Sequence, residues 1–312
     1  MELNLDKLNE YMRDCTLCPR RCHVNRLAGE KGFCGQGAEI KAARAALHFW
    51  EEPCICPREG SGAVFFCGCS LKCVYCQNYD ISMGDAGRAL SLERLTEIFL
   101  ELQAKGAANI NLVTGGHFLP QICLALKAAK NQGLSVPVVY NSSGYEEVSS
   151  LRLLEGLADI FLPDLKYHSP LLSSAYSRAP DYFEKATEAI AEMFRQAGPP
   201  VLDPEKGLLK KGVIVRHMLL PGQGGDSKRI LRYLHSTYGS DIYISIMNQY
   251  TPMPPVLRSS IPELAALKQP VPMSQYQRVL DFADRIGIER GFQQDGGTVS
   301  ESFIPAFDGE GL

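Results

Sequence analysis

Beyond residue 61 the chain alternates short apolar runs with longer segments in which apolar residues recur at helical spacing. The apolar runs predict six strands, at residues 63–67, 109–113, 137–141, 159–164, 213–219 and 241–247. The amphipathic segments predict six helices, at residues 91–105, 120–131, 146–157, 182–197, 226–238 and 274–286. One more helix is expected at residues 3–13, and Ser91 has a side chain suited to a helix N-cap.

This alternation indicates an α/β fold with a parallel sheet, because parallel neighbours need a crossover between them. Runs such as VIV and ISI suit strands that are buried on both faces. Six such units fit either an open barrel or a doubly wound sheet, and in both folds chemistry belongs at the carboxyl ends of the strands. Two segments do not follow this alternation of strands and helices and are expected to be loops: residues 198–212, and residues 251–272, of which six are proline.

Composition and periodicity divide the chain into three parts. Residues 1–61 are rich in cysteine and loops and are expected to form an N-terminal metal-binding region. Residues 62–290 carry the strand–helix units, and residues 291–312 have little periodicity and are expected to form a C-terminal tail.

Composition and charge narrow the class of protein. Hydrophobic residues make up 45% and charged residues 21% of the 312 residues, a usual mix for a globular domain. The net charge of -3 argues against a nucleic-acid partner, whose phosphates attract basic surfaces. No apolar run approaches the roughly 18 residues of a membrane helix, and the first residues lack the apolar core of a signal peptide. We therefore expect a cytoplasmic protein with no membrane partner.

The cysteine count changes the picture. Ten of the 11 cysteines lie between Cys15 and Cys76, and more than half of the chain follows with only Cys123. A disulfide framework is typical of short secreted chains, and this chain is long, lacks an export signal and has an odd count. Such a cluster in a reducing compartment favours metal or iron–sulfur binding.

The strongest local signal is the string CSLKCVYC at residues 69–76, directly after the first strand of the repeating units. Cys69, Cys73 and Cys76 can bind three irons of a cubane cluster and leave the fourth iron open to a substrate. A structural zinc site usually takes four ligands, and three core cysteines would not need a polar loop between them. The spacing therefore favours an iron–sulfur cluster over both alternatives.

In these residues the sequence resembles the radical SAM superfamily, which has this motif in the loop after the first strand of a partial (β/α)6 barrel of the TIM type. The longer string FFCGCSLKCVYCQNYDIS is similar to the activating enzymes of glycyl radical enzymes, and most similar to PflX-like proteins, which are related to pyruvate formate-lyase activating enzyme. CTLCPRRCHVNRLAGEKGFCG near the N-terminus and the later EEPCI and GSGAVFF extend the resemblance over nearly the whole chain.

The resemblance implies a radical SAM oxidoreductase with a [4Fe–4S] cluster and S-adenosylmethionine as cofactors. Reductive cleavage of S-adenosylmethionine would give a 5′-deoxyadenosyl radical for hydrogen abstraction, with a glycine of a partner glycyl radical enzyme as one substrate. An electron donor such as flavodoxin or ferredoxin is implied as a second partner. Radical chemistry on a small molecule or an RNA base, and a metal scaffold without catalysis, are the alternatives, and no acid–base catalytic residue is assigned.

Further positions match cofactor contacts of the family. Tyr75 precedes the third cysteine, where the family has an adenine contact, although an ordinary packed tyrosine also fits. Gly115 and Gly116 match the glycines of a GGE-type motif near the methionyl amine, but His117 replaces the acid, and a plain turn is the alternative.

Two strand ends carry charged residues. Asp164 and Lys166 stand two apart on one strand face, and similar D-x-K residues of the activating enzymes contact S-adenosylmethionine, although a surface ion pair is the alternative. Arg216 lies in an otherwise apolar strand, where an unpaired charge is costly. The resemblance puts it near the cofactor carboxylate, and a structural pair with an acid fits equally well. The turn at residues 141–144 is a weaker candidate for a ribose contact.

The remaining eight cysteines fall into a second possible ligand set of four and four others. Cys15, Cys18, Cys22 and Cys34 supply four thiolates, which fit tetrahedral zinc or a second iron–sulfur cluster. Cys54 and Cys56 are near enough in sequence to offer alternative ligands. Cys67 and Cys123 are expected in the core, because free cysteine is usually buried.

Overall fold

The computed structural model describes residues 4–83, 86–294 and 304–312. Its centre is a sheet of parallel strands that includes all six strands expected from the sequence, and the α/β fold is confirmed. Neighbouring strands pair in chain order along the sheet. These strands are β2 (Ser61–Phe66), β4 (Ile110–Val113), β5 (Val138–Ser142), β6 (Ile160–Pro163), β8 (Leu209–Met218) and β9 (Tyr243–Met247).

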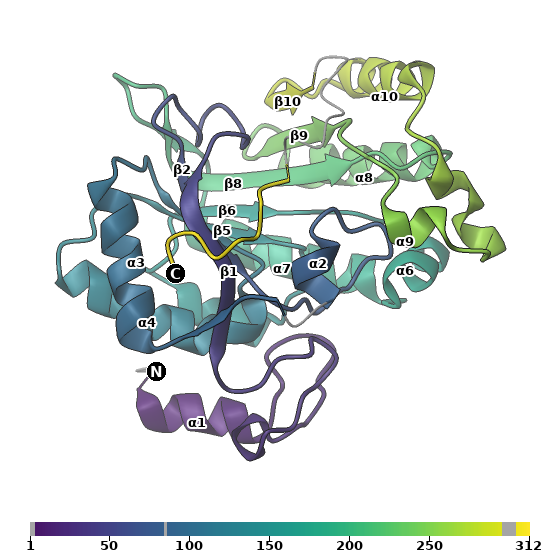
Figure 1. Cartoon of the computed structure of the whole chain (residues 1–312). Helices are drawn as coiled ribbons and strands as arrows, with labels where there is room; N and C mark the ends of the chain where they lie inside the picture. The colour runs from purple at the N-terminus through teal and green to yellow at the C-terminus, as the bar shows by residue number, and fades with distance from the viewer. Residues whose placement is uncertain (1–3, 84–85, 295–303) are drawn as a thin grey trace.

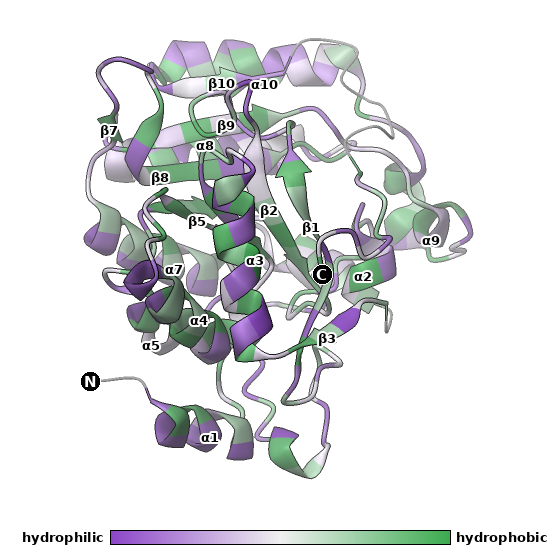
Figure 2. Ribbon diagram, turned by 60° about the vertical axis from the view of Figure 1, so that its left-hand side comes forward, coloured by the Kyte–Doolittle hydropathy of each residue, from purple (hydrophilic) through white to green (hydrophobic). Residues whose placement is uncertain are grey.

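Helices cover the outer face of this sheet, with polar residues turned outward (Figures 1 and 2). The long helices agree with the sequence prediction to within two residues at each end: α1 (Leu5–Arg13), α3 (Leu92–Ala104), α4 (Leu119–Asn131), α7 (Tyr182–Ala197), α8 (Gly224–Tyr238) and α10 (Met273–Ile286). The hydroxyl oxygen of Ser91 accepts from the Arg94 N–H at 3.1 Å and caps α3 as predicted. Apolar side chains of these helices fill one large core against the strands.

One predicted helix is shorter than expected. In place of a continuous helix at residues 146–157, the chain forms α5 (Val148–Leu151) and a 3₁₀ turn, η3 (Arg152–Leu154). Gly156 has a φ of 75°, which a continuing right-handed helix excludes, so the segment turns toward β6 instead.

Strands at both edges of the sheet were not predicted. β1 (Ile40–His48) pairs antiparallel with β2, and β3 (Arg88–Leu90) pairs with β1. At the other edge, β10 (Gly291–Gln293) pairs parallel with β9. A further strand that was not predicted, β7 (Val201–Leu202), lies off this path and pairs antiparallel with the beginning of β8. The strand path of the described residues ends at β3 and β10, so the sheet is an open, partial barrel.

The C-terminal residues lie along β1 (Figure 1). The Ala45 N–H donates to the carbonyl of Glu310 at 2.8 Å, and Arg44 pairs with Asp308 at 2.9 Å. The predicted tail at 291–312 thus begins as a sheet strand and ends against β1, near the opposite edge of the sheet, while its residues 295–303 lie outside the described part of the chain.

The expected loops contain short helical elements. Residues 251–272 form α9 (Pro254–Leu257) and η4 (Pro262–Lys268), and α2 (Tyr79–Met83) and α6 (Pro170–Ser177) follow other strands. The 3₁₀ turns η1 (Arg26–Ala28) and η2 (Gly116–Phe118) complete the set. Among the described helices, none combines the length and the apolar character needed to cross a membrane.

Candidate active site

The three cysteines of the 69–76 loop line one cavity at the carboxyl ends of the parallel strands. The loop directly follows β2, so the sheet brings it beside the ends of β5, β6, β8 and β9. The residues that the sequence analysis proposed and that line this cavity are Cys69, Cys73, Tyr75, Cys76, Asp164, Lys166 and Arg216. Residues that are far apart in the sequence therefore share one cavity, at the edge of the sheet where parallel α/β folds bind ligands.

Hydrogen-bond donors face the sulfur atoms of the loop. The N–H groups of Leu71 and Lys72 donate to Cys69 Sγ at 3.3 and 3.5 Å. The Ser177 hydroxyl, at the end of α6, donates to Cys73 Sγ at 3.1 Å. Donors aimed at sulfur stabilise a thiolate, which is the form that binds metal.

Burial raises the pKa of Cys69 to about 12, and nearby Cys73 and Cys76 thiolates add to the shift. Burial also raises the pKa of Cys76, although the Ser82 hydroxyl and the Asn78 N–H oppose it. These two thiols are therefore protonated at neutral pH without metal, and a metal centre would displace their protons.

The donor set fits a [4Fe–4S] cluster better than a single ion. No group of three His, Cys, Asp or Glu side chains in the described ranges is placed to hold one metal ion. A four-iron cluster is larger than one ion, so its three protein sulfurs stand farther apart. Three soft sulfur ligands around one cavity match this requirement.

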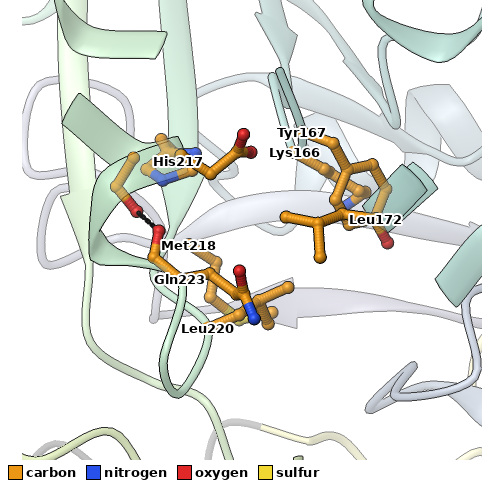
Figure 3. Close-up of a pocket in the computed structure, with 9 residues that line it drawn as sticks. Lys166, Tyr167, Leu172, His217, Met218, Leu220 and Gln223 are labelled. Atoms are coloured by element: carbon orange, nitrogen blue, oxygen red, sulfur yellow. Dashed lines mark hydrogen bonds between the residues drawn. The ribbon is translucent and has the colours of Figure 1, made fainter. Parts of the chain in front are cut away.

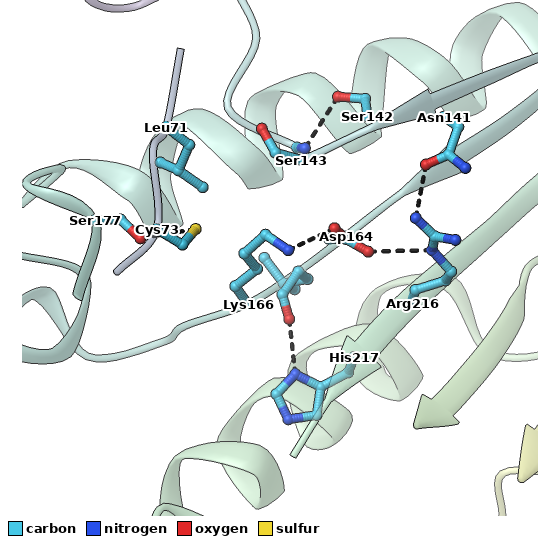
Figure 4. A network of polar contacts seen from close by, with 12 residues as sticks. Leu71, Cys73, Asn141, Ser142, Ser143, Asp164, Lys166, Ser177, Arg216 and His217 are labelled. Carbon is cyan, nitrogen blue, oxygen red and sulfur yellow. Dashed lines mark hydrogen bonds and ion pairs between the residues drawn. The ribbon is translucent and has the colours of Figure 1, made fainter. Parts of the chain in front are cut away.

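A buried charge network lines the wall opposite the loop (Figure 4). Asp164, just after β6, binds Lys166 Nζ through Oδ2 at 2.6 Å and Arg216 Nε through Oδ1 at 3.1 Å. Arg216, in β8, also pairs with Glu51 Oε2 at 3.2 Å and donates to Asn141 Oδ1 at 2.6 Å. Two acids and two bases therefore meet here, and the network is balanced in charge.

Burial alone would raise the pKa of Asp164, but the Lys166 ammonium and the Arg216 guanidinium outweigh it and hold that pKa below its ordinary value. Burial likewise opposes the charge on Lys166, and the Asp164 carboxylate overcomes it and raises the pKa of Lys166. Both groups stay ionised near neutral pH. The wall thus presents fixed charges of both signs, as the amino and carboxylate groups of an amino acid require.

The segment after β6, which carries Asp164 and Lys166, is also held by hydrogen bonds on the side away from the cavity. His217 Nδ1 lies 2.7 Å from the carbonyl of Leu165, and the Asp226 carboxylate accepts from the N–H groups of His168 and Ser169 at 2.8 and 3.0 Å. Figure 3 shows the crevice between these elements, which is closed by packed side chains such as Leu172. The crevice is therefore a supporting contact, and the ligand space lies on the other side of Lys166.

Glu51 is the residue of this site that the sequence analysis missed. It follows β1 and accepts from Asn111 Nδ2 at 2.9 Å as well as from Arg216. The sequence gives one indication of such a residue: Arg216 lies in an apolar strand, where its charge needs an acidic partner. The chain contains many Asp and Glu residues, however, and their positions in the sequence do not show which of them pairs with Arg216.

Tyr75 lines the cavity, yet its hydroxyl already bonds the Tyr167 hydroxyl at 2.6 Å. Its ring packs edge to face on Tyr176 and Tyr250, with centroids 6.2 and 6.0 Å away. The predicted adenine contact can use only the part of the ring that faces the cavity, and it stays a prediction.

Gly115 and Gly116 lie beside the cavity wall rather than in it. A Cβ on Gly115 would stand 2.6 Å from Ile122 Cδ1, and one on Gly116 would stand 2.5 Å from Glu146 Oε2, so a larger residue at either position would have to push that side chain aside. Thr114, which precedes them, lines the cavity. Their predicted contact with the cofactor amine stays a prediction.

His117, which replaces the acid of the family motif, is buried and its Nε2 lies 2.6 Å from the carbonyl of Cys67. Burial lowers the pKa of His117 to about 3, so the ring is neutral. It supports the loop and does not substitute for an acidic ligand contact.

The second cysteine set also gathers in space. The pKa of Cys18 is raised, first by burial and further by Cys34 and Cys15, and that of Cys34 is raised by burial together with Cys15 and Cys22. Cys22 Sγ accepts from the Phe33 N–H at 3.3 Å. The four thiols therefore lie close enough to interact, but no three of them are placed to hold one metal ion, so a cluster fits this set better than a single zinc ion.

The other cysteines stand apart from both groups. Burial raises the pKa of Cys54 to about 12, and the charges that act on Cys54 and Cys56 are Glu51 and Glu52 rather than the N-terminal thiols. Cys67 and Cys123 are fully buried, as predicted.

A buried carboxyl near the second set gives a pH-dependent prediction. Burial raises the pKa of Glu146 to about 7, while the Ser142 hydroxyl, 2.7 Å away, opposes the shift. The folded state therefore holds the proton more tightly than the unfolded state, and stability falls as pH rises from about 4.5 to about 7. Over that window we expect wild type to lose on the order of 3 kcal/mol relative to Glu146→Gln.

Urea unfolding of both proteins at several pH values measures this difference, and Glu59→Gln, on the surface, is the matched control. Equal pH slopes for wild type and Glu146→Gln would contradict the buried carboxyl. A slope that disappears only in Glu146→Gln supports it.

Comparison with known proteins agrees with this geometry. A model of the radical SAM superfamily matches residues 63–234, which is more than half of the chain. The chain therefore belongs to the radical SAM superfamily, whose enzymes use a [4Fe–4S] cluster and S-adenosylmethionine.

Two relatives come from Methanocaldococcus jannaschii. The uncharacterized protein MJ0674 is 25% identical over 297 residues, which cover 93% of this chain and 80% of the relative. The uncharacterized protein MJ0808 is 22% identical over 249 residues, which cover 74% of this chain and 67% of the relative.

The solved structures that match this chain include the following two. A domain of pyruvate-formate lyase-activating enzyme from Bacteroides vulgatus has a TM-score of 0.39 and 11% identity, covering 57% of this chain and 92% of that one. SuiB of Streptococcus suis, bound to S-adenosylmethionine, has a TM-score of 0.48 and 11% identity, covering 76% of this chain and 50% of that one.

Proposed function

We propose that this chain reductively cleaves S-adenosylmethionine and uses the resulting radical to remove a hydrogen atom from a glycine of a partner protein. The observation that carries the cleavage is the single cavity that joins Cys69, Cys73 and Cys76 to the Asp164, Lys166 and Arg216 network. The glycine as hydrogen donor rests on the resemblance of the 69–76 region to activating enzymes of glycyl radical enzymes.

When bound, the cluster would supply one electron to the sulfonium of S-adenosylmethionine, and cleavage would give methionine and a 5′-deoxyadenosyl radical able to abstract the hydrogen atom. The cluster would be held by Cys69, Cys73 and Cys76, and Lys166 and Arg216 would orient the carboxylate of S-adenosylmethionine. Asp164 would orient the amine or the ribose hydroxyls. A reduced protein of flavodoxin or ferredoxin type would deliver the electron.

Access for a partner is supported by the residues at the edge of the cavity. Trp50 lines the cavity and has 54% of its surface exposed, and Phe49 beside it is 53% exposed. Exposed aromatic side chains are enriched where proteins bind one another. A polypeptide segment that reached this edge would meet the cavity directly.

Isotope transfer tests the proposal. Glycyl radical enzymes encoded in the same genome are produced with deuterated glycine and incubated anaerobically with the reconstituted, reduced chain and S-adenosylmethionine. We expect deuterium in 5′-deoxyadenosine by mass spectrometry and a glycyl radical in the partner by EPR. Formation of 5′-deoxyadenosine without deuterium transfer and without a partner radical would reject the glycine while leaving the cleavage intact.

A further inference from the structure

The N-terminal cysteine segment touches the loop that carries the catalytic cysteines. Arg20, which lies between Cys18 and Cys22 in the sequence, donates through Nε to the carbonyl of Ser70 at 2.9 Å. Its Nη2 donates to the carbonyl of Ser177 at 2.8 Å. One guanidinium therefore ties the second cysteine set to both sides of the active-site loop.

The contact continues to a cluster sulfur. Ser177, whose carbonyl accepts from Arg20, donates its own hydroxyl to Cys73 Sγ at 3.1 Å. The guanidinium of Arg20 is fixed from its other face by Phe33, whose ring centroid lies 3.9 Å away. A shift of Arg20 would therefore move a hydrogen-bond donor of Cys73.

Backbone packing joins the same two regions. A Cβ on Gly68, the residue before Cys69, would stand 2.8 Å from the carbonyl oxygen of Cys34 and 2.5 Å from Gln36 Cγ. Gly68 has a φ of 81°, so the glycine allows both the turn and the close approach. A change in the conformation of the N-terminal segment would therefore also affect the beginning of the 69–76 loop.

A second arginine supplies independent evidence for an anionic centre. Arg26 is only 2% exposed, and its hydrogen bonds go to neutral carbonyls, among them His117 at 2.6 Å and Gly37 at 2.8 Å. No carboxylate pairs with it in the part of the chain that the structure describes, and a buried cation without a counter-charge is costly. Gly37, whose carbonyl accepts from Arg26, follows Cys34 by three residues, so the guanidinium lies beside the end of the second cysteine set.

A cluster held by four thiolates carries net negative charge, and it is the form of the centre that fits this set, because no three of these side chains are placed to hold one metal ion. Such a centre beside Arg26 would compensate the buried guanidinium. It would also fix the Cys18–Cys22 turn and, with it, Arg20.

We propose that Cys15, Cys18, Cys22 and Cys34 hold a metal centre that positions the catalytic loop through Arg20, so that filling this centre sets the environment of Cys73 in the active site. This inference rests on the proposed cluster site and extends it: Arg20 is a positioning residue that acts through Ser70 and Ser177. Hydrogen bonds to cluster sulfurs raise the reduction potential. Loss of the link should make the catalytic cluster harder to reduce.

The test uses the full chain after anaerobic reconstitution, with iron or with zinc added to the N-terminal centre in separate preparations. Arg20→Gln cuts the link and keeps the four cysteines, Cys22→Ser removes one thiolate, and Ser177→Ala removes the donor to Cys73. Arg13→Gln, in the exposed end of α1, is the matched control. Metal content, the EPR spectrum and the midpoint potential of the catalytic cluster are measured for each, and all are readable whether or not S-adenosylmethionine is cleaved.

We expect Arg20→Gln to retain the second metal, to lower the midpoint potential as Ser177→Ala does, and to weaken S-adenosylmethionine binding roughly tenfold. Cys22→Ser should lose the second metal and lower the potential in the same direction, and Arg20→Lys should recover part of the shift. The metal that restores the wild-type potential identifies the centre. The proposal is overturned if wild type binds no metal beyond the catalytic cluster, or if Arg20→Gln has the potential and spectrum of Arg13→Gln while Ser177→Ala differs.

Discussion

Replacing Cys73 with alanine should abolish the catalytic cluster and reduce the formation of 5′-deoxyadenosine to background. Cys73 is one of three sulfurs around the cavity, and a cubane with only two protein ligands is not held in place. Its sulfur also accepts a hydrogen bond from the Ser177 hydroxyl at 3.1 Å, so the substitution removes a ligand and its orienting contact together. Iron content, the EPR spectrum and anaerobic product analysis measure the loss.

Cys123→Ala is the matched control, because Cys123 is equally inaccessible but lies within α4 and far from the cavity lining. It should keep the wild-type iron content and activity, with only a modest loss of stability from the missing sulfur. Normal cleavage of S-adenosylmethionine by Cys73→Ala would show that the 69–76 loop does not hold the catalytic cluster.

The parts of this molecule that could be predicted are those in which local sequence carries the signal. The core strands are continuous apolar runs, and α7 has the predicted ends because its apolar spacing is regular throughout. β1 was missed because four of the nine residues in its sequence, IKAARAALH, are alanine, which has low strand propensity, and charged residues stand among them. Pairing with β2 and cover from the C-terminal residues decide its structure, and neither is visible locally.

The residues of the site also differ in how far local sequence could predict them. The spacing of Cys69, Cys73 and Cys76 is a local pattern within eight residues, so the sequence could group them. The charge network joins Glu51 to Arg216, which lie 165 positions apart, and only the fold selects that acid among many. The arginine links from the N-terminal segment end on backbone carbonyls, which carry no sequence signature at all.

The second large effect is expected at Arg216. Arg216→Met would remove the cation between Asp164 and Glu51 and leave two buried carboxylates, with Lys166 as the remaining partner of Asp164 alone. Removing one partner from a buried ion pair costs about 3–5 kcal/mol, since the other charge stays without compensation. We expect a loss of this size in the free energy of unfolding, measured anaerobically with urea, together with loss of S-adenosylmethionine binding.

Two further variants separate the network from a general effect of deleting an arginine. Arg94→Met breaks contacts with Glu97 and Glu101 on the exposed side of α3 and should cost less than about 1 kcal/mol. Adding Glu51→Gln to Arg216→Met removes one of the stranded charges, so the double variant should regain part of the stability, with a coupling of about 0.5–3 kcal/mol. It should not regain S-adenosylmethionine binding, because the cation that would orient the carboxylate is still missing. Additive losses in the double variant would mean that Glu51 and Arg216 do not act as a pair, and recovered binding would remove Arg216 from the cofactor site.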